Sequence, residues 1–297
     1  MRFYDQLTSR RASFARRIAD GPIVVAPGVY DLLSAKIADA LGFAALYMTG
    51  YGINASLLGR PDAGLGTFRD FVERVRTLSE QTQTPLIADA DTGFGGALNV
   101  QETVRGYERA GAAAIQIEDQ VFPKRCGHTL GREVVPTADM VLKIRVACDT
   151  REDPNFLIIA RTDARTTQGL DEALTRAKAY RDAGADILFV ESPESADELA
   201  QIGRALKGTP LLANMVPGGR TPVQSAAELE AMGFRLVIHP GACLAPAAGA
   251  MRAALKHLQS HGDSRGAPGS AFSFTELHPI VGFDQVWAFD EKYRGTH

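Results

Sequence analysis

Acidic and polar residues follow several short apolar runs of this sequence, where parallel strands would bring them together. Asp89 and Asp91 lie two residues apart in "ADADTGFGG". Later runs end in "IEDQ", "ARTDA", "VESPE" and "ANM", which contain Glu118, Asp119, Arg161, Asp163, Glu191 and Asn214. Carboxylates that share one cleft cannot all stay ionised without a cation between them. Because the set contains no His or Cys, its oxygen ligands predict Mg²⁺, or Mn²⁺, rather than zinc.

These residues are not all expected to do chemistry. Arg161 and Asn214 suit a substrate carboxylate, through a forked contact and a hydrogen bond. A single Asp at a strand end is also a common helix cap or turn residue, and we expect that role for Asp163 and a loop contact for Asp119. The glycines of "TGFGG" leave room for a ligand beside Asp89 and Asp91, but they match no phosphate-binding motif.

The segment 120–136 is the longest expected loop, and it concentrates reactive side chains. Its centre is the five-residue run Lys124, Arg125, Cys126, Gly127 and His128. Cationic neighbours favour the ionisation of a thiol, and glycines allow a loop to move. We interpret this segment as a mobile lid that carries a proton donor, with an ordinary charged loop as the alternative.

The other cysteines and one histidine are expected to be structural. Cys148 and Cys243 lack charged neighbours of this kind, so we expect them to be packed. Three cysteines without a CxxC spacing argue against a disulfide framework and a zinc knuckle, and they fit a reducing cytoplasm. His239 ends an apolar run, and we expect a core position for it, with a position in the site lining as the alternative.

Eight short apolar runs alternate with amphipathic segments along the chain, which predicts an α/β fold with buried parallel strands. The expected strands are Ile23–Ala26, Ala45–Met48, Leu86–Asp89, Ile115–Glu118, Leu157–Ala160, Ile187–Val190, Leu211–Ala213 and Leu236–His239. The expected helices between them include Asp31–Leu41, Val100–Ala110, Leu170–Ala183 and Ala226–Met232.

A weak internal repeat favours a closed barrel over an open sheet. "ALGFAALYMTG", "RAGAAAIQIED", "DAGADILFVES" and "AMGFRLVIHPG" each join the end of a helix to an even-numbered strand. The helix-ending glycines Gly42, Gly111, Gly184 and Gly233 are expected in the left-handed conformation. Repetition at a fixed phase predicts a (β/α)₈ TIM barrel, which carries its chemistry at the carboxyl ends of the strands.

The two ends of the chain depart from this repeat. The Arg-rich start is interrupted by Asp5 and Asp20, which indicates an amphipathic first helix rather than a targeting peptide. A polar linker begins at residue 261 and leads into an apolar, helical C-terminal extension. We therefore divide the chain into a barrel (residues 1–260) and an extension (261–297). The extension is expected to pack on a neighbouring subunit of a homo-oligomer, a tetramer, with its own barrel as the alternative.

Composition excludes several classes of function. The 297 residues carry a formal net charge of −3 without a basic tract, which argues against nucleic acid and anionic membranes as partners. No apolar run approaches the roughly 18 residues of a membrane span. No expected strand end carries the Lys of a pyridoxal-phosphate enzyme, and only His239 could serve a zinc hydrolase. A non-catalytic scaffold would not explain the collected polar residues, so a small-molecule enzyme is expected.

The combined motifs resemble one known group of enzymes. "DADTGFGG", "IEDQ…KRCGH", "ARTDA" and "ANM…GG.TP" are similar to the isocitrate lyase/phosphoenolpyruvate mutase superfamily, from about residue 25 to residue 258. "KRCGH" resembles its lyase branch, because the members that act on C–P bonds lack that Cys. The resemblance implies a magnesium-dependent enzyme on a TIM barrel.

The resemblance also implies roles for matching residues. Metal binding, largely through water, is implied for Asp62, Asp89, Asp91 and Glu118. Substrate binding is implied for Tyr47, Thr49, Gly50, Tyr51, Arg161, Glu191 and Asn214. Cys126 would be the general acid, with Glu118, Lys124, Arg161 and His128 as the other catalytic residues; the base is either a carboxylate such as Glu118 or a metal-linked water.

The implied reaction is cleavage of a C–C bond in a 2-hydroxy acid to a 2-oxo acid, such as pyruvate, and a carboxylate. The chain has "GHTLGR", "NMVPGG" and "TGYG" where bacterial 2-methylisocitrate lyases have "GHRPNK", "NITEFG" and "SGGG". These segments are more similar to the dimethylmalate lyase, petal-death and oxaloacetate hydrolase group. A 2-substituted malate or 2-methylisocitrate is the expected substrate, and oxaloacetate hydrolysis or decarboxylation is the alternative.

Overall fold

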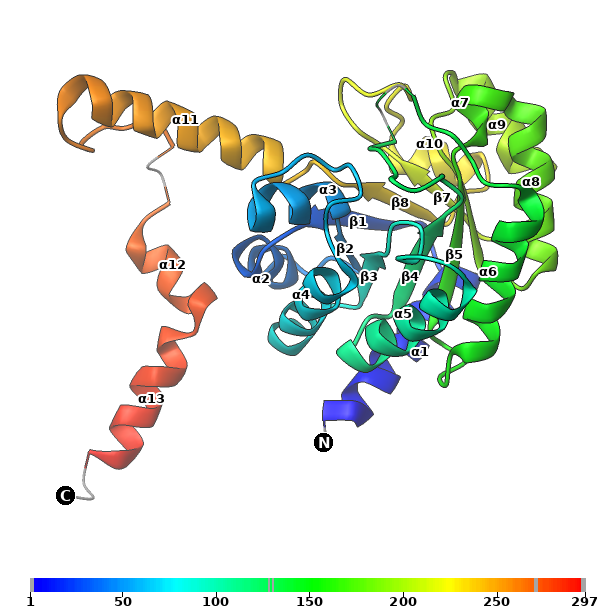
Figure 1. The fold of residues 1–297 in the computed structure, drawn as a ribbon. Coiled ribbons are helices and arrows are strands. Elements are labelled where there is room, and N and C mark those ends of the chain that lie inside the picture. Colours follow the sequence, from blue (N-terminus) through cyan, green and yellow to red (C-terminus); the bar gives the residue numbers. More distant parts are fainter. Residues whose placement is uncertain (1–2, 128, 130, 270–271, 295–297) are drawn as a thin grey trace.

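Eight parallel strands form a closed barrel in this computed structural model, which describes residues 3–127, 129, 131–269 and 272–294. Each strand pairs with the next along the chain, and the first pairs with the eighth (Figure 1). The strands are β1 (Val24–Val29), β2 (Leu46–Met48), β3 (Leu86–Asp89), β4 (Ala114–Glu118), β5 (Leu157–Thr162), β6 (Ile187–Val190), β7 (Leu211–Asn214) and β8 (Leu236–His239). The predicted TIM barrel is confirmed, and each predicted strand overlaps an observed one.

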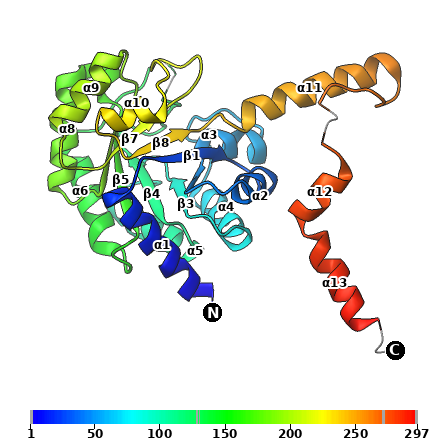
Figure 2. The same cartoon turned by 180° about the vertical axis from the view of Figure 1, so that it is seen from behind.

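Helices follow the strands and surround the barrel in both views (Figures 1 and 2). The first part of the chain contains α1 (Phe3–Asp20), α2 (Leu32–Ala40), α3 (Gly50–Ile53), the π-helix η1 (Asn54–Leu58), α4 (Phe68–Gln81), α5 (Ala97–Ala110) and α6 (Thr137–Thr150). The second part contains α7 (Ala164–Gln168), α8 (Leu170–Asp182), α9 (Ala196–Ala205), α10 (Ala226–Ala231), α11 (Leu244–His261), α12 (Phe274–Val281) and α13 (Phe283–Tyr293).

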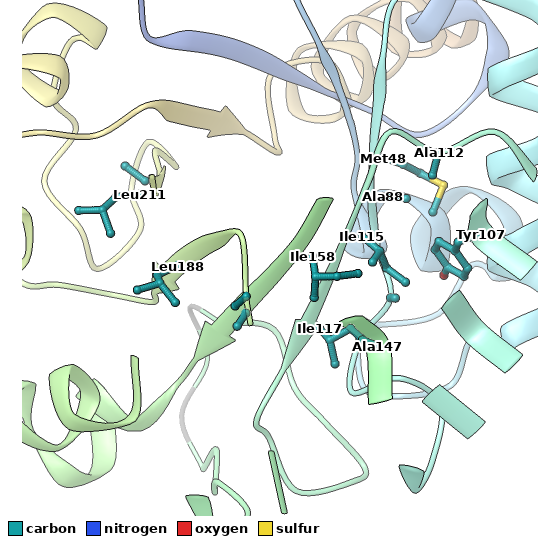
Figure 3. Close-up of a cluster of buried hydrophobic side chains, with 14 of the residues drawn as sticks. Met48, Ala88, Tyr107, Ala112, Ile115, Ile117, Ala147, Ile158, Leu188 and Leu211 are labelled. Carbon is teal, nitrogen blue, oxygen red and sulfur yellow. The ribbon is translucent and has the colours of Figure 1, made fainter. Parts of the chain in front are cut away.

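Alternating side chains along the strands divide the core into two layers. One layer lies between the strands and the surrounding helices, and Figure 3 shows part of it, with Ile115, Ile158 and Leu188 among its members. The other fills the barrel interior and includes Phe14 and Ile18 of α1. The first helix thus packs against the inner layer of the barrel, as its amphipathic sequence predicts.

The inner layer changes from apolar to polar toward the carboxyl ends of the strands. Along β5, the buried side chains of Leu157 and Ile159 belong to the inner cluster, and Arg161 follows at the same two-residue interval. Along β6, the corresponding series Ile187, Phe189 leads to Glu191. The regular register of the barrel therefore delivers polar side chains into its interior at one end.

Glycines end several helices in the way the internal repeat predicts. Gly42, Gly111, Gly184 and Gly233 have φ values of +76°, +102°, +109° and +99°. A residue without a Cβ adopts this left-handed conformation without steric cost. Each of these turns leads directly into the next strand, so the prediction is confirmed.

The last three helices extend away from the barrel (Figures 1 and 2). None of α11, α12 and α13 has a buried residue, although α12 contacts α2 of the same barrel. Exposed apolar side chains continue along them: Met251, Leu255, Leu258, Phe272, Phe274, Val281, Phe283, Val286, Trp287, Phe289 and Tyr293. Helix α11 starts before residue 260 and already leaves the barrel. The division of the chain into a barrel and an extension at residue 260 stays a prediction. Within the part of the chain that the structure describes, no helix is long and apolar enough to cross a membrane.

Candidate active site

A cavity of about 460 Å³ opens at the carboxyl ends of the strands. Most of the residues predicted for the site line it. They are Tyr47, Thr49, Tyr51, Asp62, Asp89, Cys126, Arg161, Glu191 and Asn214. Gly127 also lines it, as do apolar residues from the end of β8 and the start of α11. The polar residues come from the strands β2, β3, β5 and β7, from α3, and from the loops after β2, β4 and β6, so the barrel brings together side chains far apart in sequence.

Three other predicted residues lie in the layer behind the cavity wall. Asp91, Glu118 and Lys124 are buried but do not line the cavity. Gly50 begins α3 and donates its backbone N–H to Asp89 Oδ2 at 3.2 Å. His128 lies outside the residues that the structure describes.

Asp89 is held by its neighbours in a defined orientation. Its Oδ1 accepts hydrogen bonds from the backbone N–H of Asp91 at 3.0 Å and from Gln116 Nε2 at 3.4 Å. Gln116 Oε1 in turn accepts a hydrogen bond from the Tyr47 hydroxyl at 3.0 Å. Burial, with the nearby Asp89 charge, raises the pKa of Tyr47 well above its usual value. Tyr47 therefore stays a neutral donor at the cavity wall.

Lys124 forms a buried ion-pair cluster with two of the predicted metal-site carboxylates. Its Nζ lies 2.5 Å from Asp62 Oδ1 and 2.8 Å from Asp91 Oδ1. Burial raises the pKa of Asp91 to about 7, although the Lys124 charge lowers it. Burial likewise raises the pKa of Asp89. The cluster thus carries more carboxylates than one ammonium group can neutralise, and it retains a capacity for a further cation.

Arg161 occupies the centre of the polar layer. Its Nη1 lies 3.3 Å from Glu118 Oε2, and its Nη2 lies 3.4 Å from Glu191 Oε2. Burial alone would lower the pKa of Arg161, but Asp163, Glu118 and Glu191 raise it well above its usual value. Its side chain is 9% exposed and lines the cavity, so a permanent cation faces the cavity.

The predicted cap role of Asp163 is wrong. Its side chain makes no capping hydrogen bond at the start of α7. Instead, Oδ2 accepts a hydrogen bond from Arg161 Nε at 2.8 Å, and Oδ1 accepts one from Arg161 Nη2 at 2.9 Å. The backbone continues the inward alternation for two residues beyond Arg161, which directs this carboxylate to the guanidinium. Asp163 is therefore part of the site.

Asp119 supports this arrangement from behind. Its Oδ1 accepts a hydrogen bond from the backbone N–H of Asp163 at 2.9 Å. Its Oδ2 accepts hydrogen bonds from Thr162 Oγ1 and from the Tyr180 hydroxyl, both at 2.7 Å. The expectation of a structural contact for Asp119 is confirmed, and this contact ties the end of β5 to α8.

Glu191 joins the loop after β4 to the end of β6. Its Oε2 accepts a hydrogen bond from Asn214 Nδ2 at 3.2 Å. Its Oε1 accepts one from the backbone N–H of Ser192 at 2.8 Å, and the Ser192 hydroxyl donates one to the carbonyl of Gly127 at 3.0 Å. Ser192 has φ of +59°, a costly backbone conformation for a residue with a Cβ. These contacts hold Gly127 directly over Arg161 and Glu191.

Cys126 reaches the cavity on this loop. Its backbone N–H donates to the carbonyl of Asp62 at 3.1 Å, and its side chain lines the cavity. The loop is closed at its base by a bridge between Gln120 and Val134. Cys148 and Cys243 pack against the hydrophobic core, as expected, and none of the three cysteines forms a disulfide. His239 is partly buried and is absent from the cavity lining.

Comparisons with known proteins agree with this geometry. The family model described as phosphoenolpyruvate phosphomutase matches residues 14–259. The 2,3-dimethylmalate lyase of Eubacterium barkeri is 49% identical over 271 residues, which cover 91% of this chain and 93% of that protein. A 2-methylisocitrate lyase of Aeropyrum pernix is 42% identical, over 88% of this chain and 83% of that protein.

Solved structures give the same result. A crystal structure of 2,3-dimethylmalate lyase, a PEP mutase/isocitrate lyase superfamily member, has 42% identity and a TM-score of 0.88, covering 97% of this chain and 95% of that one. This chain belongs to the PEP mutase/isocitrate lyase superfamily. Oxaloacetate acetylhydrolase in complex with 3,3-difluorooxalacetate has 38% identity and a TM-score of 0.90, covering 95% and 97%. Phosphonopyruvate hydrolase in complex with oxalate and Mg²⁺ has 30% identity and a TM-score of 0.86, covering 96% and 99%.

Membership of this superfamily confirms the resemblance found in the sequence and the enzyme class expected from it, a carbon–carbon lyase. Sequence reasoning nevertheless missed part of the site. Gln116, which links Tyr47 to Asp89, lies two residues before Glu118 on β4, so the alternation of the strand could have revealed it. The apolar wall could not have been found in this way, because the segment after β7, the end of β8 and the start of α11 contribute it together. That wall consists of Val216, Ile238, Pro240, Leu244, Ala245 and Ala248.

The carboxylates of this superfamily member fit a hydrated divalent ion better than a fully coordinated one. In the described part of the chain, no group of three His, Cys, Asp or Glu side chains is arranged to bind an ion directly. However, Glu118 Oε1 is buried without a hydrogen-bond partner among the described atoms, and burial raises the pKa of Glu118 well above its usual value. A Cβ at Gly50 would lie 2.6 Å from Asp89 Oδ2, so this glycine keeps the approach to that carboxylate open.

Proposed function

We propose that this enzyme cleaves the C2–C3 bond of a 2-substituted malate, such as 2,3-dimethylmalate, or of 2-methylisocitrate. The products are a 2-oxo acid, pyruvate, and a carboxylate. The observation that carries the proposal is the position of Cys126, which lines one cavity together with Arg161 and Asp89. Cleavage leaves a carbanion at C3 that needs a proton donor, and a thiol at the cavity wall can supply one.

Mg²⁺ is the proposed cofactor, with Mn²⁺ as the alternative. Asp89, Asp91, Glu118 and Asp62 would hold it, largely through water. When bound, it would make the C2 hydroxyl of the substrate more acidic. The raised pKa values of Asp91 and Glu118 support this role, as does the Mg²⁺ present with oxalate in the related phosphonopyruvate hydrolase.

The other residues around the cavity would bind the two carboxylates of the substrate. Arg161 binds the carboxylate of the 2-oxo acid portion, and Tyr47, Thr49, Gly50 and Tyr51 complete that half of the site. Glu191 and Asn214 line the pocket of the second carboxylate. These assignments are supported by the cavity lining and by the cation that Arg161 presents there.

Proton transfer would involve the layer behind the wall and the loop after β4. The proposed base for the C2 hydroxyl proton is a carboxylate such as Glu118, with a metal-linked water as the alternative; burial raises the pKa of Glu118. Lys124 would hold Asp62 and Asp91 in place, while Cys126 protonates the C3 carbanion. His128, on the same loop, is proposed as a further catalytic residue.

The composition of the wall favours an alkyl-substituted dicarboxylate over a tricarboxylate. Arg161 is the one cation among the described residues that line the cavity, and three carboxylates already surround it. A third substrate carboxylate would have to lie beside apolar side chains such as Val216, Leu244 and Ala248. Burying a charge there without a partner is costly, whereas a methyl group fits.

Oxaloacetate hydrolysis, or decarboxylation, is the alternative reaction of the same cavity. The similarity to oxaloacetate acetylhydrolase, with a TM-score of 0.90, favours keeping this candidate. The carbanion it leaves is that of acetate, which also takes a proton but is unbranched, so the room for a methyl group at the apolar wall would have no use.

The test is a panel assay of the purified protein with Mg²⁺. The substrates are 2,3-dimethylmalate, 2-methylisocitrate, isocitrate and oxaloacetate, and Cys126→Ser and a chelator serve as controls. Pyruvate release from 2,3-dimethylmalate that chelation abolishes is the expected result. Consumption of oxaloacetate alone would establish the alternative, and no turnover of any substrate would contradict the proposal.

We also propose a homo-oligomer, a tetramer, in the cytoplasm. The exposed apolar side chains of α12 and α13 support assembly, with Trp287 51% and Phe289 64% exposed. Light scattering coupled to size-exclusion chromatography should give the mass of a tetramer, and Trp287→Glu with Phe289→Glu should lower it. Lys178→Glu on α8 is the control for added charge. A monomeric wild-type protein would contradict this proposal.

A further inference from the structure

One buried carboxylate connects the cavity to the loop after β4. Asp163 Oδ1 accepts a hydrogen bond from Arg161 Nη2, and the same oxygen accepts one from Arg132 Nη1 at 2.5 Å. The side chains of Arg132 and Asp163 are completely buried. Charge-assisted hydrogen bonds of this kind are strong and are little screened by solvent. Arg132 does not line the cavity, and Asp163 joins it to Arg161, which does.

Arg132 lies near the base of this loop, in the part that leads back to the barrel. Its Nη2 donates a hydrogen bond to Thr166 Oγ1 of α7 at 2.6 Å. The next residue, Glu133, accepts a hydrogen bond through its carbonyl from the backbone N–H of Val121 at 2.8 Å. The tip of the loop, six residues earlier, carries Cys126 to the cavity. The loop after β4 therefore carries Cys126 and also contacts Asp163, the partner of Arg161.

Asp163 holds the guanidinium group of Arg161 in one orientation. It takes the Nε and Nη2 edge of the guanidinium, while Nη1 lies toward Glu118. Burial alone would raise the pKa of Asp163, but Arg161 and Arg132 hold it below its usual value. Both guanidinium groups therefore favour the ionised form of this buried carboxylate. Without Arg132, Asp163 would keep its two hydrogen bonds to Arg161 but would lose its hydrogen bond to the second guanidinium group.

We propose that Arg132 is a positioning residue for Arg161 and acts through Asp163. It aligns the cation that binds the substrate carboxylate, and it does so from the loop that delivers Cys126. This inference rests on the proposed function, because its kinetic test uses the proposed substrate.

The test compares three variants of the full-length protein. Arg132→Met removes both hydrogen bonds and the charge, Arg132→Lys restores the charge, and Thr166→Val removes only the contact with α7. For Arg132→Met we expect KM for 2,3-dimethylmalate to rise about 10- to 100-fold, which is the change that corresponds to the loss of one charged hydrogen bond. The rise falls on KM because Arg161 binds the carboxylate before and during the reaction. Arg132→Lys should recover much of the loss, and Thr166→Val should stay within about twofold of wild type.

Calorimetric binding of oxalate in the presence of Mg²⁺ gives a second measurement that needs no turnover. Its affinity should weaken in Arg132→Met as KM rises. A variant with a lower melting temperature but wild-type KM and oxalate affinity would make Arg132 merely structural and overturn the inference. If Arg132→Met does not fold, Arg132→Gln, which also removes the charge, takes its place: a raised KM in that folded variant supports the inference and an unchanged KM overturns it. A wild-type protein that binds oxalate but does not turn over 2,3-dimethylmalate would refute the substrate, while oxalate binding would still test Arg132.

Discussion

Magnesium binding should release a proton from Asp91, and its affinity should therefore depend on pH. Burial raises the pKa of Asp91 to about 7, despite the Lys124 ammonium 2.8 Å away. A carboxyl group must ionise to face a cation, so protons compete with the metal below this pKa. For a pKa of about 7, the ionised fraction rises from about 0.09 at pH 6 to about 0.91 at pH 8. The dissociation constant for Mg²⁺ should fall about tenfold over that range, or by about 1.4 kcal/mol.

Isothermal titration calorimetry at pH 6, 7 and 8 would measure this linkage. Each titration is repeated in two buffers with different ionisation enthalpies, so that the difference in heat counts the protons released. We expect Asp91 to contribute close to one proton at pH 6 and close to none at pH 8. Asp91→Asn should weaken the dependence, and Asp182→Asn, at an exposed carboxylate on α8, should keep it. Equal affinity at pH 6 and pH 8 without proton release would refute this account of the carboxylate cluster.

Three further variants test separate parts of the structure. Cys126→Ser should lower kcat about 10²- to 10⁴-fold with little change in KM, as expected for loss of a general acid, in steady-state assays with 2,3-dimethylmalate. Gly127→Ala would place a Cβ 2.6 Å from Arg161 Nη2 and should lower kcat/KM at least about tenfold; Gly96→Ala, which meets open space, is its control, and equal effects of the two would contradict the packing argument. Tyr180→Phe removes the hydrogen bond to Asp119 and should cost about 1–2 kcal/mol in urea unfolding, whereas an unchanged midpoint would show that this bond contributes nothing.

The sequence was sufficient to predict the barrel because its signals are local and repeated. Each strand is a short apolar run, and glycines such as Gly111 and Gly184 end helices at the same phase of the repeat. The carboxyl ends of parallel strands must meet, so Asp89, Arg161 and Glu191 could be placed together without knowing a single contact.

What the sequence did not reveal depends on contacts between distant segments. Asp163 was predicted to cap a helix, because a strand-end Asp has that role often, and its two arginine partners lie on different segments. The apolar wall of the cavity combines Ile238 of β8 with Leu244 of α11, a helix whose departure from the barrel has no local sequence signal. Tertiary geometry, rather than propensity, decides such positions.

The central claim is most directly tested by following the reaction in deuterium oxide by proton NMR. Purified wild-type protein, Mg²⁺ and 2,3-dimethylmalate should yield pyruvate and propionate in equal amounts, with one deuterium at C2 of propionate. Cys126→Ser should form both products far more slowly. If 2,3-dimethylmalate stays intact while oxaloacetate is converted to oxalate and acetate, the enzyme is a hydrolase and the proposed cleavage is wrong.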